Sequence, residues 1–254
     1  MPNNFIEKQV LKLKLEKYTG IESEAFFIDV DRLRKGEPYE YVKGYTYFLD
    51  AYIDLSLRPM IPREESAFWV QRAIVELEAL QAKLERPLRL AELFAGSGTI
   101  GLALLVHFKD AYVDICELDP KLKEQIEINF EKNSISSDRG RAITASGLDG
   151  LTGEYDAIFA IPPYIPYEAL PELDQEMIDY EPHMAFLAHE DGHEFHNLLI
   201  EHAREYLSEH GTLYMEADMD HDAWVRERVK GTEWSSLEFW PDPYGATPNV
   251  ILRK

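Results

Sequence analysis

Residues 90–101 read LAELFAGSGTIG, an apolar run that passes through a glycine-containing turn into a helical pattern. Gly96 and Gly98 fall where a buried strand gives way to its helix, and glycine there lets the backbone turn tightly and approach a ligand closely. About 20 residues further on, Glu117 ends the next apolar stretch, where a carboxylate can accept hydrogen bonds from ribose hydroxyls. This pattern predicts a cofactor with a ribose at the first strand–helix junction.

Two other interpretations of this segment remain open from the residues alone. The glycines also suit an ordinary strand–helix turn, with Glu117 as a solvated strand end. Gly101 follows Gly98 by three positions, so GxGxxG is literally present and the loop by itself does not exclude NAD.

Strands and helices are expected to alternate along the rest of the chain. The expected strands cover 88–94, 111–117, 142–145, 155–161, 212–216, 237–240 and 250–252, and a strand-like aromatic stretch covers 41–53. The expected helices cover 5–17, 66–84, 120–133 and 194–208, with another from the glycine turn to about 108. This alternation predicts an α/β fold with a mostly parallel sheet covered by helices on both faces.

Composition excludes several classes of protein. A net charge of −21 disfavours broad attachment to nucleic acid, whose phosphates would repel such a surface. The single cysteine, Cys116, excludes an internal disulfide framework. The longest apolar stretch, 100–108, is too short to span a bilayer, and the first residues lack the pattern of a signal peptide. We therefore expect a cytoplasmic protein with no membrane association, and a monomer.

The fourth expected strand runs into a second motif. Residues 155–164 read YDAIFAIPPY, a buried strand that ends in Pro162, Pro163 and Tyr164. Ligand-binding loops of open parallel sheets follow the carboxyl ends of the strands, so this loop should face the glycine loop across a crevice. The alternative is that the diproline only terminates the strand.

From Gly36 onward the motifs together resemble a known family. They are GEPYEYVKG at 36–44, Phe48, IPREES at 61–66, ELFAGSGTIGLAL at 92–104, ELDP at 117–120, IPPYIP at 161–166, YEPHMAF at 180–186, EDG at 190–192 and GTLYMEAD at 211–218. In this order they resemble the release factor glutamine methyltransferases of the HemK/PrmC type, over about 85% of the chain.

The resemblance implies a Rossmann-like class I methyltransferase with a seven-stranded sheet, a helical N-terminal extension (1–40), a linker hairpin (41–66) and a catalytic domain (67–254). It implies S-adenosylmethionine as cofactor, S-adenosylhomocysteine as product, and the glutamine of the Gly-Gly-Gln loop of a release factor as substrate. The implied cofactor residues are Glu92, Phe94, Ala95, Gly96, Gly98, Glu117, Leu118, Ser146 and Gly147. The implied catalytic loop is Ile161, Pro162, Pro163 and Tyr164. Phe48, Pro62 and Glu65, together with Tyr164, are implied to contact the substrate.

The chain departs from the family pattern most clearly at Ile161, where the family has asparagine. In the family, the asparagine side-chain oxygen accepts an N–H bond from the substrate amide and orients the amide nitrogen. Without an acceptor, one unpaired donor costs about 1–3 kcal/mol, roughly 10- to 100-fold in rate, unless another side chain supplies the oxygen. A catalytically weakened or retired relative that binds cofactor or a partner is therefore the alternative function. Nucleic-acid adenine methylation and NAD-dependent oxidoreduction rank lower.

Three smaller departures affect the expected sites. Ser146 stands where the family has an aspartate near the adenine, with Asp149 nearby as a substitute. Phe94 replaces the first glycine of the family's loop, and the N-terminal extension is shorter than usual. Residues 189–193 read HEDGH, which matches the zinc motif HExxH, but Gly192 disfavours the continuous helix that this motif needs, so no metal is expected. We interpret the neighbouring histidines, His196 among them, as exposed.

Overall fold

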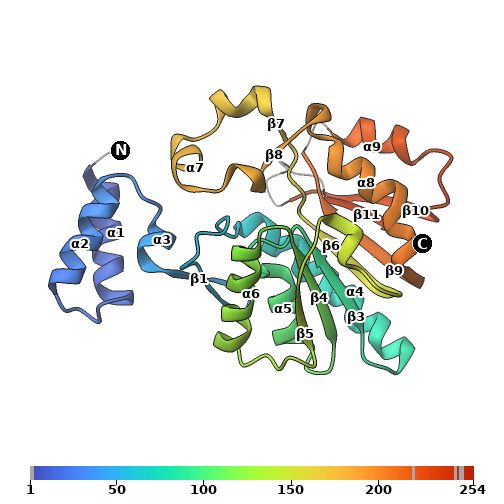
Figure 1. The fold of residues 1–254 in the computed structure, drawn as a ribbon, viewed down its shortest axis with the longest axis horizontal. Coiled ribbons are helices and arrows are strands. Elements are labelled where there is room, and N and C mark those ends of the chain that lie inside the picture. The colour runs from blue at the N-terminus through green and yellow to red at the C-terminus, as the bar shows by residue number, and fades with distance from the viewer. Residues whose placement is uncertain (1–2, 219–220, 243–244, 246–248) are drawn as a thin grey trace.

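The computed structural model describes residues 3–218, 221–242, 245 and 249–254 (Figure 1). Its α-helices are α1 (Asn3–Glu16), α2 (Glu24–Arg34), α3 (Tyr39–Lys43), α4 (Glu64–Leu84), α5 (Thr99–His107), α6 (Pro120–Lys132), α7 (Gln175–Tyr180), α8 (Glu194–His202) and α9 (Asp222–Val229). Its strands are β1 (Tyr45–Phe48), β2 (Ala51–Asp54), β3 (Arg89–Leu93), β4 (Tyr112–Glu117), β5 (Gly140–Thr144), β6 (Tyr155–Ala160), β7 (Ile165–Pro166), β8 (Leu187–Ala188), β9 (Leu207–Glu216), β10 (Ser236–Trp240) and β11 (Asn249–Arg253). Short 3-10 turns join several of them.

A seven-stranded sheet in the order β10-β11-β9-β6-β3-β4-β5 forms the centre of the molecule. Strands β9, β6, β3, β4 and β5 pair in parallel, and β11 runs antiparallel to both of its neighbours. The strand order reverses at β3, the position at which open sheets of this kind form a ligand crevice. The predicted α/β fold, with a mostly parallel seven-stranded sheet and helices on both faces, is confirmed (Figure 1).

The central strands are apolar along most of their length, and successive side chains of a strand point to opposite sides. Both faces of the sheet are therefore apolar. Leu90, Ile115 and Phe159 pack into a core shared with α4, α5 and α6. Their neighbours in the chain, such as Ala91 and Cys116, pack into a second core shared with α8 and α9. The strands therefore read as continuous apolar runs, and their carboxyl ends converge at one edge of the sheet.

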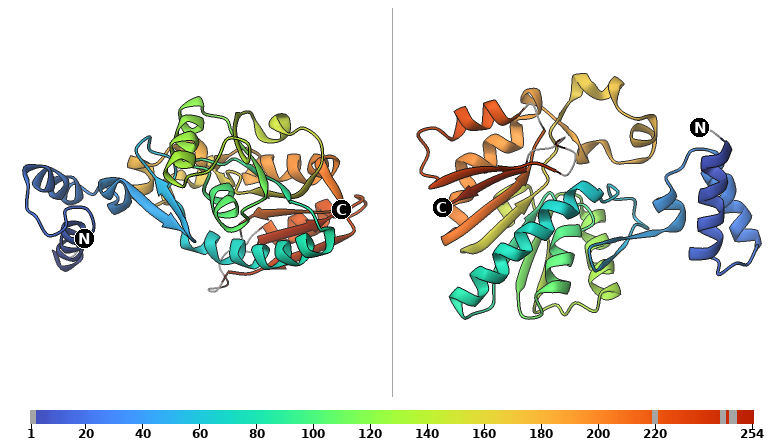
Figure 2. Two further views of the ribbon diagram at one scale, coloured as in Figure 1. Left: turned by 90° about the horizontal axis from the view of Figure 1, so that it is seen from below. Right: turned by 180° about the vertical axis from the view of Figure 1, so that it is seen from behind.

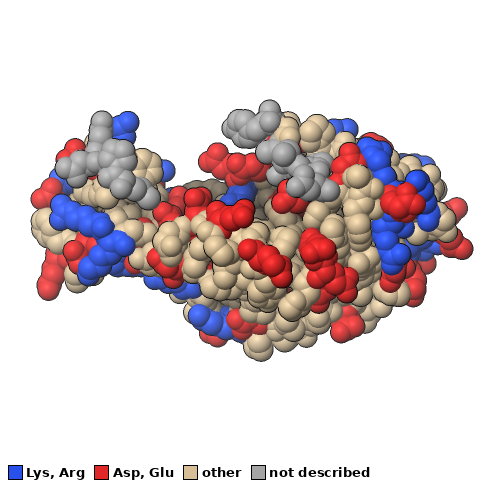
Figure 3. Space-filling model, turned by 90° about the horizontal axis from the view of Figure 1, so that it is seen from above, with Lys and Arg blue, Asp and Glu red and all other residues tan. Residues whose placement is uncertain are grey.

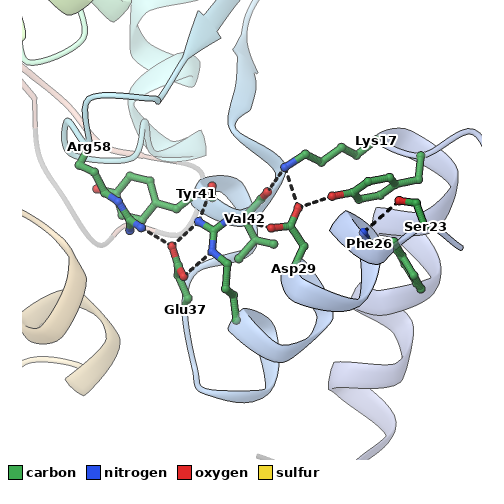
Figure 4. Close-up of polar contacts among 10 residues, drawn as sticks. Lys17, Ser23, Phe26, Asp29, Glu37, Tyr41, Val42 and Arg58 are labelled. Atoms are coloured by element: carbon green, nitrogen blue, oxygen red, sulfur yellow. Dashed lines mark hydrogen bonds and ion pairs between the residues drawn. The ribbon is translucent and has the colours of Figure 1, made fainter.

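The first two helices form a small unit beside the sheet domain, connected to it through α3 and the β1–β2 hairpin (Figure 2). A polar network fixes this unit (Figure 4). Arg32 of α2 donates two hydrogen bonds to Glu37, of 2.8 and 2.6 Å, and Arg58 pairs with the same carboxylate. Asp29 accepts bonds of 2.7 Å from both Lys17 and the Tyr18 hydroxyl. Glu37 thereby joins α2 to the segment that leads into α4.

The hairpin is held against the sheet domain by amide side chains of α6. Gln125, Asn129 and Asn133 are four residues apart and lie on one face of the helix. Their side-chain oxygens accept backbone N–H bonds of 2.7–2.8 Å from the hairpin segment around β2. The exposed edge of a two-stranded hairpin is thus paired with a helix, and this fixes the hairpin beside the crevice.

Several sequence-based elements are corrected by the structure. The stretch 41–53 is not a single strand: Gly44, at φ 93, ends α3, and the β1–β2 hairpin follows. The helix predicted to reach 208 ends at His202, and β9 starts at Leu207 because this fully buried leucine pairs with Tyr155. Helices α2, α7 and α9 were not predicted. For α2 the signal was present, since Ser23 caps its first turn by accepting a bond from the Phe26 N–H.

Within the described ranges no helix is long and apolar enough to cross a bilayer. The predicted domain boundaries at 40 and 66 stay predictions, and the first two residues of the predicted extension lie outside the described residues. Acidic side chains outnumber basic ones across the middle of the face seen in Figure 3, in keeping with the net charge of −21.

Candidate functional site

A cleft of about 1110 Å³, counted out to its open mouth, lies beyond the carboxyl ends of the central strands. The residues predicted from sequence that line it are Phe48, Pro62, Glu92, Phe94, Ala95, Gly96, Glu117, Leu118, Ser146, Gly147, Ile161 and Pro163. They come from segments spread over more than a hundred residues of sequence, and the sheet brings them to one cavity. The predicted glycine loop and PPY loop therefore share one cleft.

Glu117 ends β4 and organises the glycine loop. One carboxylate oxygen accepts the Gly96 N–H at 2.7 Å, and the other accepts the Asp119 N–H at 2.9 Å. Burial raises the pKa of Glu117, while these backbone donors oppose the rise. A carboxylate has about four acceptor positions, so Glu117 keeps capacity for a ligand hydroxyl.

Gly96 itself supplies the space for such a ligand. Its φ of 55 lies in the left-handed region, and a Cβ built on it meets no protein atom within 4 Å. Because Gly96 lines the cleft, a side chain there would occupy the space in front of Glu117. The donors and acceptors present thus suit a nucleoside with free ribose hydroxyls, which is the chemistry of the predicted cofactor.

Glu92 lies behind the loop and closes the start of α5. Its carboxylate accepts the N–H groups of Ile100 and Gly101 at 3.0 and 2.8 Å. These are donors that the first turn of a helix otherwise leaves unpaired. Burial raises the pKa of Glu92 to about 8. A Cβ on Gly101 would lie 2.5 Å from Ile115 and 2.9 Å from Glu92, so the third glycine of GxGxxG serves close packing.

Two residues of the loop, Gly98 and Phe94, have structural roles beyond the predicted contact with the cofactor. Gly98 caps α5 at φ 76 and lies against Ile126 of α6, rather than in the cleft wall. Phe94 adopts φ 55, a conformation that a bulky residue rarely takes. This explains why a glycine suits that position, and the Phe94 ring instead packs edge-on against Phe195 at 5.1 Å.

The PPY loop forms the opposite wall. Ile161 and Pro163 line the cleft, whereas Pro162 is buried behind them. The Tyr164 hydroxyl donates a 3.2 Å hydrogen bond to Glu216, and burial, reinforced by the Glu216 charge, raises the pKa of Tyr164 well above its usual value. Tyr164 therefore stays a protonated donor that ties the loop to the end of β9.

The linker supplies part of the rim of the cleft. Phe48 and Pro62 line the cleft, and their predicted contact with substrate stays a prediction. Glu65 is exposed on the first turn of α4, and its neighbour Ser66 lines the cleft instead. The predicted contact of Glu65 with substrate stays a prediction. Asp149, offered as the adenine-side carboxylate, is exposed and is not part of the cleft wall, which Ser146 forms.

Sequence reasoning assigned no role to several residues of the cleft wall. They are Met60, Ile61, Arg63, Ser66, Met184, Phe195 and Glu216, among others. Glu216 carried a usable signal, because it is an acidic residue at the carboxyl end of an apolar strand next to β6. Ser66 and Phe195 lie in the first turns of α4 and α8, and the others come from connecting segments whose folding the sequence pattern does not reveal.

The HExxH match has no helical geometry. Glu190, Asp191 and Gly192 are all left-handed, with φ of 55, 53 and 85, and α8 begins only at Glu194. Among the described residues, no three His, Cys, Asp or Glu side chains are placed to hold a metal ion. His196, interpreted as exposed, is fully buried, and that expectation was wrong. Burial lowers the pKa of His196 to about 4, and Nε2 lies 2.9 Å from the Glu216 carbonyl.

The sheet order, the glycine loop with its acidic strand end and the facing PPY loop define a class I methyltransferase. Structural comparison agrees with this fold. The catalytic domain of human METTL16, solved with an RNA hairpin, superimposes with a TM-score of 0.63 at 13% identity, covering 91% of this chain and 82% of that one. A methyltransferase from Pyrococcus furiosus gives 0.51 at 19% identity, over 71% and 82% of the two chains.

Sequence comparison narrows the class to a family, although no family model matches the chain. The release factor glutamine methyltransferase of Bradyrhizobium diazoefficiens is 33% identical over 199 residues, covering 78% of this chain and 66% of that protein. Its counterpart in Lactococcus lactis is 28% identical over 206 residues, covering 81% and 73%. The chain belongs to the release factor glutamine methyltransferase family, and it spans about two thirds to three quarters of the length of these relatives.

Proposed function

We propose that the chain transfers a methyl group from S-adenosylmethionine to the side-chain amide nitrogen of the glutamine in the Gly-Gly-Gln loop of a peptide chain release factor. The observation that carries this proposal is the shared cleft, which is lined both by Glu117 at the end of β4 and by Ile161 after β6, on either side of β3. The printed names of the relatives support the choice of acceptor.

The cofactor side is assigned to the glycine loop. Glu117 would bind the ribose hydroxyls, and Gly96 would let the protein backbone approach the cofactor closely. Leu118, Ser146 and Gly147 would border the base. When bound, S-adenosylmethionine supplies an electrophilic methyl group on a sulfonium centre. The task of the protein is to exclude water and to hold the two reactants in contact, which alone accounts for much of the acceleration in such transfers.

The substrate side is assigned to the PPY loop and the linker. Pro163 and Ile161 would flank the glutamine side chain, and Phe48 and Pro62 would cover its stem. An amide nitrogen is a weak nucleophile because its lone pair is delocalised, so its N–H groups need acceptors that fix the nitrogen toward the methyl group. The Pro162 carbonyl is one such acceptor in the family pattern.

The test is transfer of radiolabelled methyl from S-adenosylmethionine to purified release factor. We expect labelling that disappears when the Gly-Gly-Gln glutamine is replaced by alanine. If the chain binds the cofactor but leaves the release factor unlabelled, the proposal is overturned. An oligonucleotide arm belongs in the same experiment, and label in the oligonucleotide alone would move the assignment to nucleic-acid methylation.

One observation favours a second candidate. Ile161 lines the cleft at the position of the family's asparagine and offers no hydrogen-bond acceptor. A relative that binds cofactor or release factor without turnover would show cofactor affinity in calorimetry and no transfer in the assay above.

A further inference from the structure

We infer that Glu216 supplies the hydrogen-bond acceptor that Ile161 cannot, and thereby orients the substrate amide. This inference rests on the proposed function and identifies the residue that makes it chemically workable in this chain. It starts from a deficit: the primary amide presents two N–H donors, and the PPY loop of this chain offers only the Pro162 carbonyl.

Glu216 lies beside Ile161, the position at which the hydrogen-bond acceptor is missing. Strands β6 and β9 are parallel neighbours, and their last paired residues are Ala160 and Met215. Ile161 and Glu216 are the next residues of the two chain segments, so both lie at the carboxyl ends of neighbouring strands, on the same edge of the sheet. Both also line the same cleft. Glu216 is only 8% exposed, so its carboxylate is held in a largely dry environment.

The carboxylate is fixed and still has capacity for one more donor. Oε2 accepts the Ser66 hydroxyl at 2.7 Å and the Trp69 indole N–H at 3.1 Å. Oε1 accepts the Tyr164 hydroxyl at 3.2 Å. Three of about four acceptor positions are therefore used, and the one that remains is on Oε1. These contacts on three sides restrict the side chain to one orientation, as preorganisation requires.

The other carboxylates of the cleft are committed elsewhere. Glu92 accepts two backbone N–H groups at the start of α5. Glu117 ends β4, separated from β6 and its PPY loop by β3, and it accepts the Gly96 N–H of the glycine loop. Among the described residues that line the cleft, Glu216 alone is a carboxylate hydrogen-bonded to the PPY loop itself.

The charge of Glu216 has a consequence for specificity. A carboxylate attracts the N–H groups of glutamine and repels a glutamate of the same shape. The cleft should therefore distinguish release factor with glutamine from release factor in which glutamate replaces it, independently of any methyl transfer.

The experiment compares Glu216→Gln, Ile161→Asn and the double variant. In Glu216→Gln the single oxygen stays with Trp69, whose indole can only donate, and the NH₂ group is left to face the substrate. We expect kcat to fall roughly 10- to 100-fold, the loss of one acceptor, with the dissociation constant of S-adenosylmethionine changed less than about 3-fold. Ile161→Asn should restore at least about 10-fold in the Glu216→Gln background, yet improve the unaltered chain by less than about 3-fold.

Binding gives a second readout that needs no turnover. The unaltered chain should bind release factor at least about 10-fold more tightly than it binds a release factor in which glutamate replaces the glutamine. Glu216→Gln should reduce this ratio of affinities. Glu76→Gln is the matched control, because Glu76 also accepts a tyrosine hydroxyl from β9, that of Tyr214 at 2.8 Å, and does not line the cleft. It should change neither readout.

The outcomes separate this inference from the proposed function. If Glu216→Gln leaves kcat and the binding ratio unchanged in a chain that methylates release factor, only the role of Glu216 is wrong. If kcat, melting temperature and cofactor affinity fall together and Ile161→Asn restores nothing, Glu216 only anchors α4 to β9. If the unaltered chain binds cofactor but labels no release factor, the proposed function fails, and the role of Glu216 fails with it.

Discussion

The two walls of the cleft are built in different ways. The cofactor wall comes mainly from the continuous β3–α5–β4 unit, in which Glu117 accepts the Gly96 N–H and Glu92 caps α5, and Ser146 and Gly147 after β5 complete it. The acceptor wall is assembled from distant segments: the PPY loop, the linker, residues 182–185 and the end of β9. The first wall keeps most of the residues that the family resemblance implies, and the second replaces asparagine with Ile161. In a wall held by local contacts few residues can change. In a wall built from several segments, a hydrogen-bond acceptor lost from one segment can be supplied by another.

The largest expected effect lies on the cofactor wall. Glu117→Gln removes the charge that two ribose hydroxyls would contact, so S-adenosylmethionine should bind roughly 200-fold more weakly, a loss of about 3 kcal/mol. Isothermal titration calorimetry measures this directly. Glu124→Gln, an exposed change on α6, is the control. An unchanged affinity in Glu117→Gln would remove Glu117 from the cofactor site.

The next effect concerns the acceptor wall. A Cβ on Gly192, at φ 85, would lie 2.1 Å from the Tyr164 carbonyl oxygen, so Gly192→Ala must displace the PPY loop. We expect a loss of about 2–3 kcal/mol of unfolding free energy, measured by urea titration, and a fall in methyl transfer larger than the fall in cofactor affinity.

Gly231→Ala is the matched control for this change. Gly231 has a similar φ of 78, but nothing lies within 4 Å of its added Cβ. It should cost only the left-handed strain of about 1 kcal/mol. Equal losses in the two variants would show that the turn does not position the PPY loop.

A smaller effect should distinguish two neighbouring amides of α6. Asn129 accepts the Asp54 N–H at 2.7 Å and donates to the Ser97 carbonyl of the glycine loop at 3.0 Å, whereas Asn133 contacts the hairpin but not that loop. Replacing either with alanine should cost about 1–2 kcal/mol of stability. Only Asn129→Ala should also weaken cofactor binding, by about 3- to 5-fold in calorimetry. Equal cofactor affinity in the two variants would contradict a link between hairpin and cofactor wall.

The smallest effect is expected outside the cleft, in the network that joins the N-terminal unit. Hydrogen bonds from Arg32 lower the pKa of Glu37 below its usual value of 4.5. A carboxyl with a lowered folded pKa stabilises the fold above its unfolded pKa and loses that contribution as pH falls through the folded value. The protection factors of the α2 amides, which compare observed with intrinsic exchange at each pH, should therefore fall below about pH 4.5. Glu37→Gln should weaken this acid dependence, because only the contributions of Asp29 and Asp31 then remain, at a cost under about 1 kcal/mol, and an unchanged pH profile would contradict it.

Local sequence patterns were enough to predict the sheet domain. Apolar runs at 88–94, 111–117 and 155–161, separated by helical periodicity, predicted three of the central strands closely, because strands buried on both faces are apolar throughout. The patterns failed where tertiary contacts decide. Leu207 joins β9 rather than a helix because its fully buried side chain sits opposite Tyr155, and no local signal shows that partner.

The sequence by itself determined the fold class and the family, and it predicts the glycine-loop side of the cofactor wall. The residues of that loop are close in sequence, and their backbone conformations follow from glycine positions and strand ends. Only the tertiary structure decided the acceptor wall. Sequence shows that Ile161 has no oxygen to offer, but the pairing of β6 with β9 is what sets the Glu216 carboxylate beside it. Strand order is a long-range property, since it depends on which apolar faces pack together, and therefore no short motif encodes it.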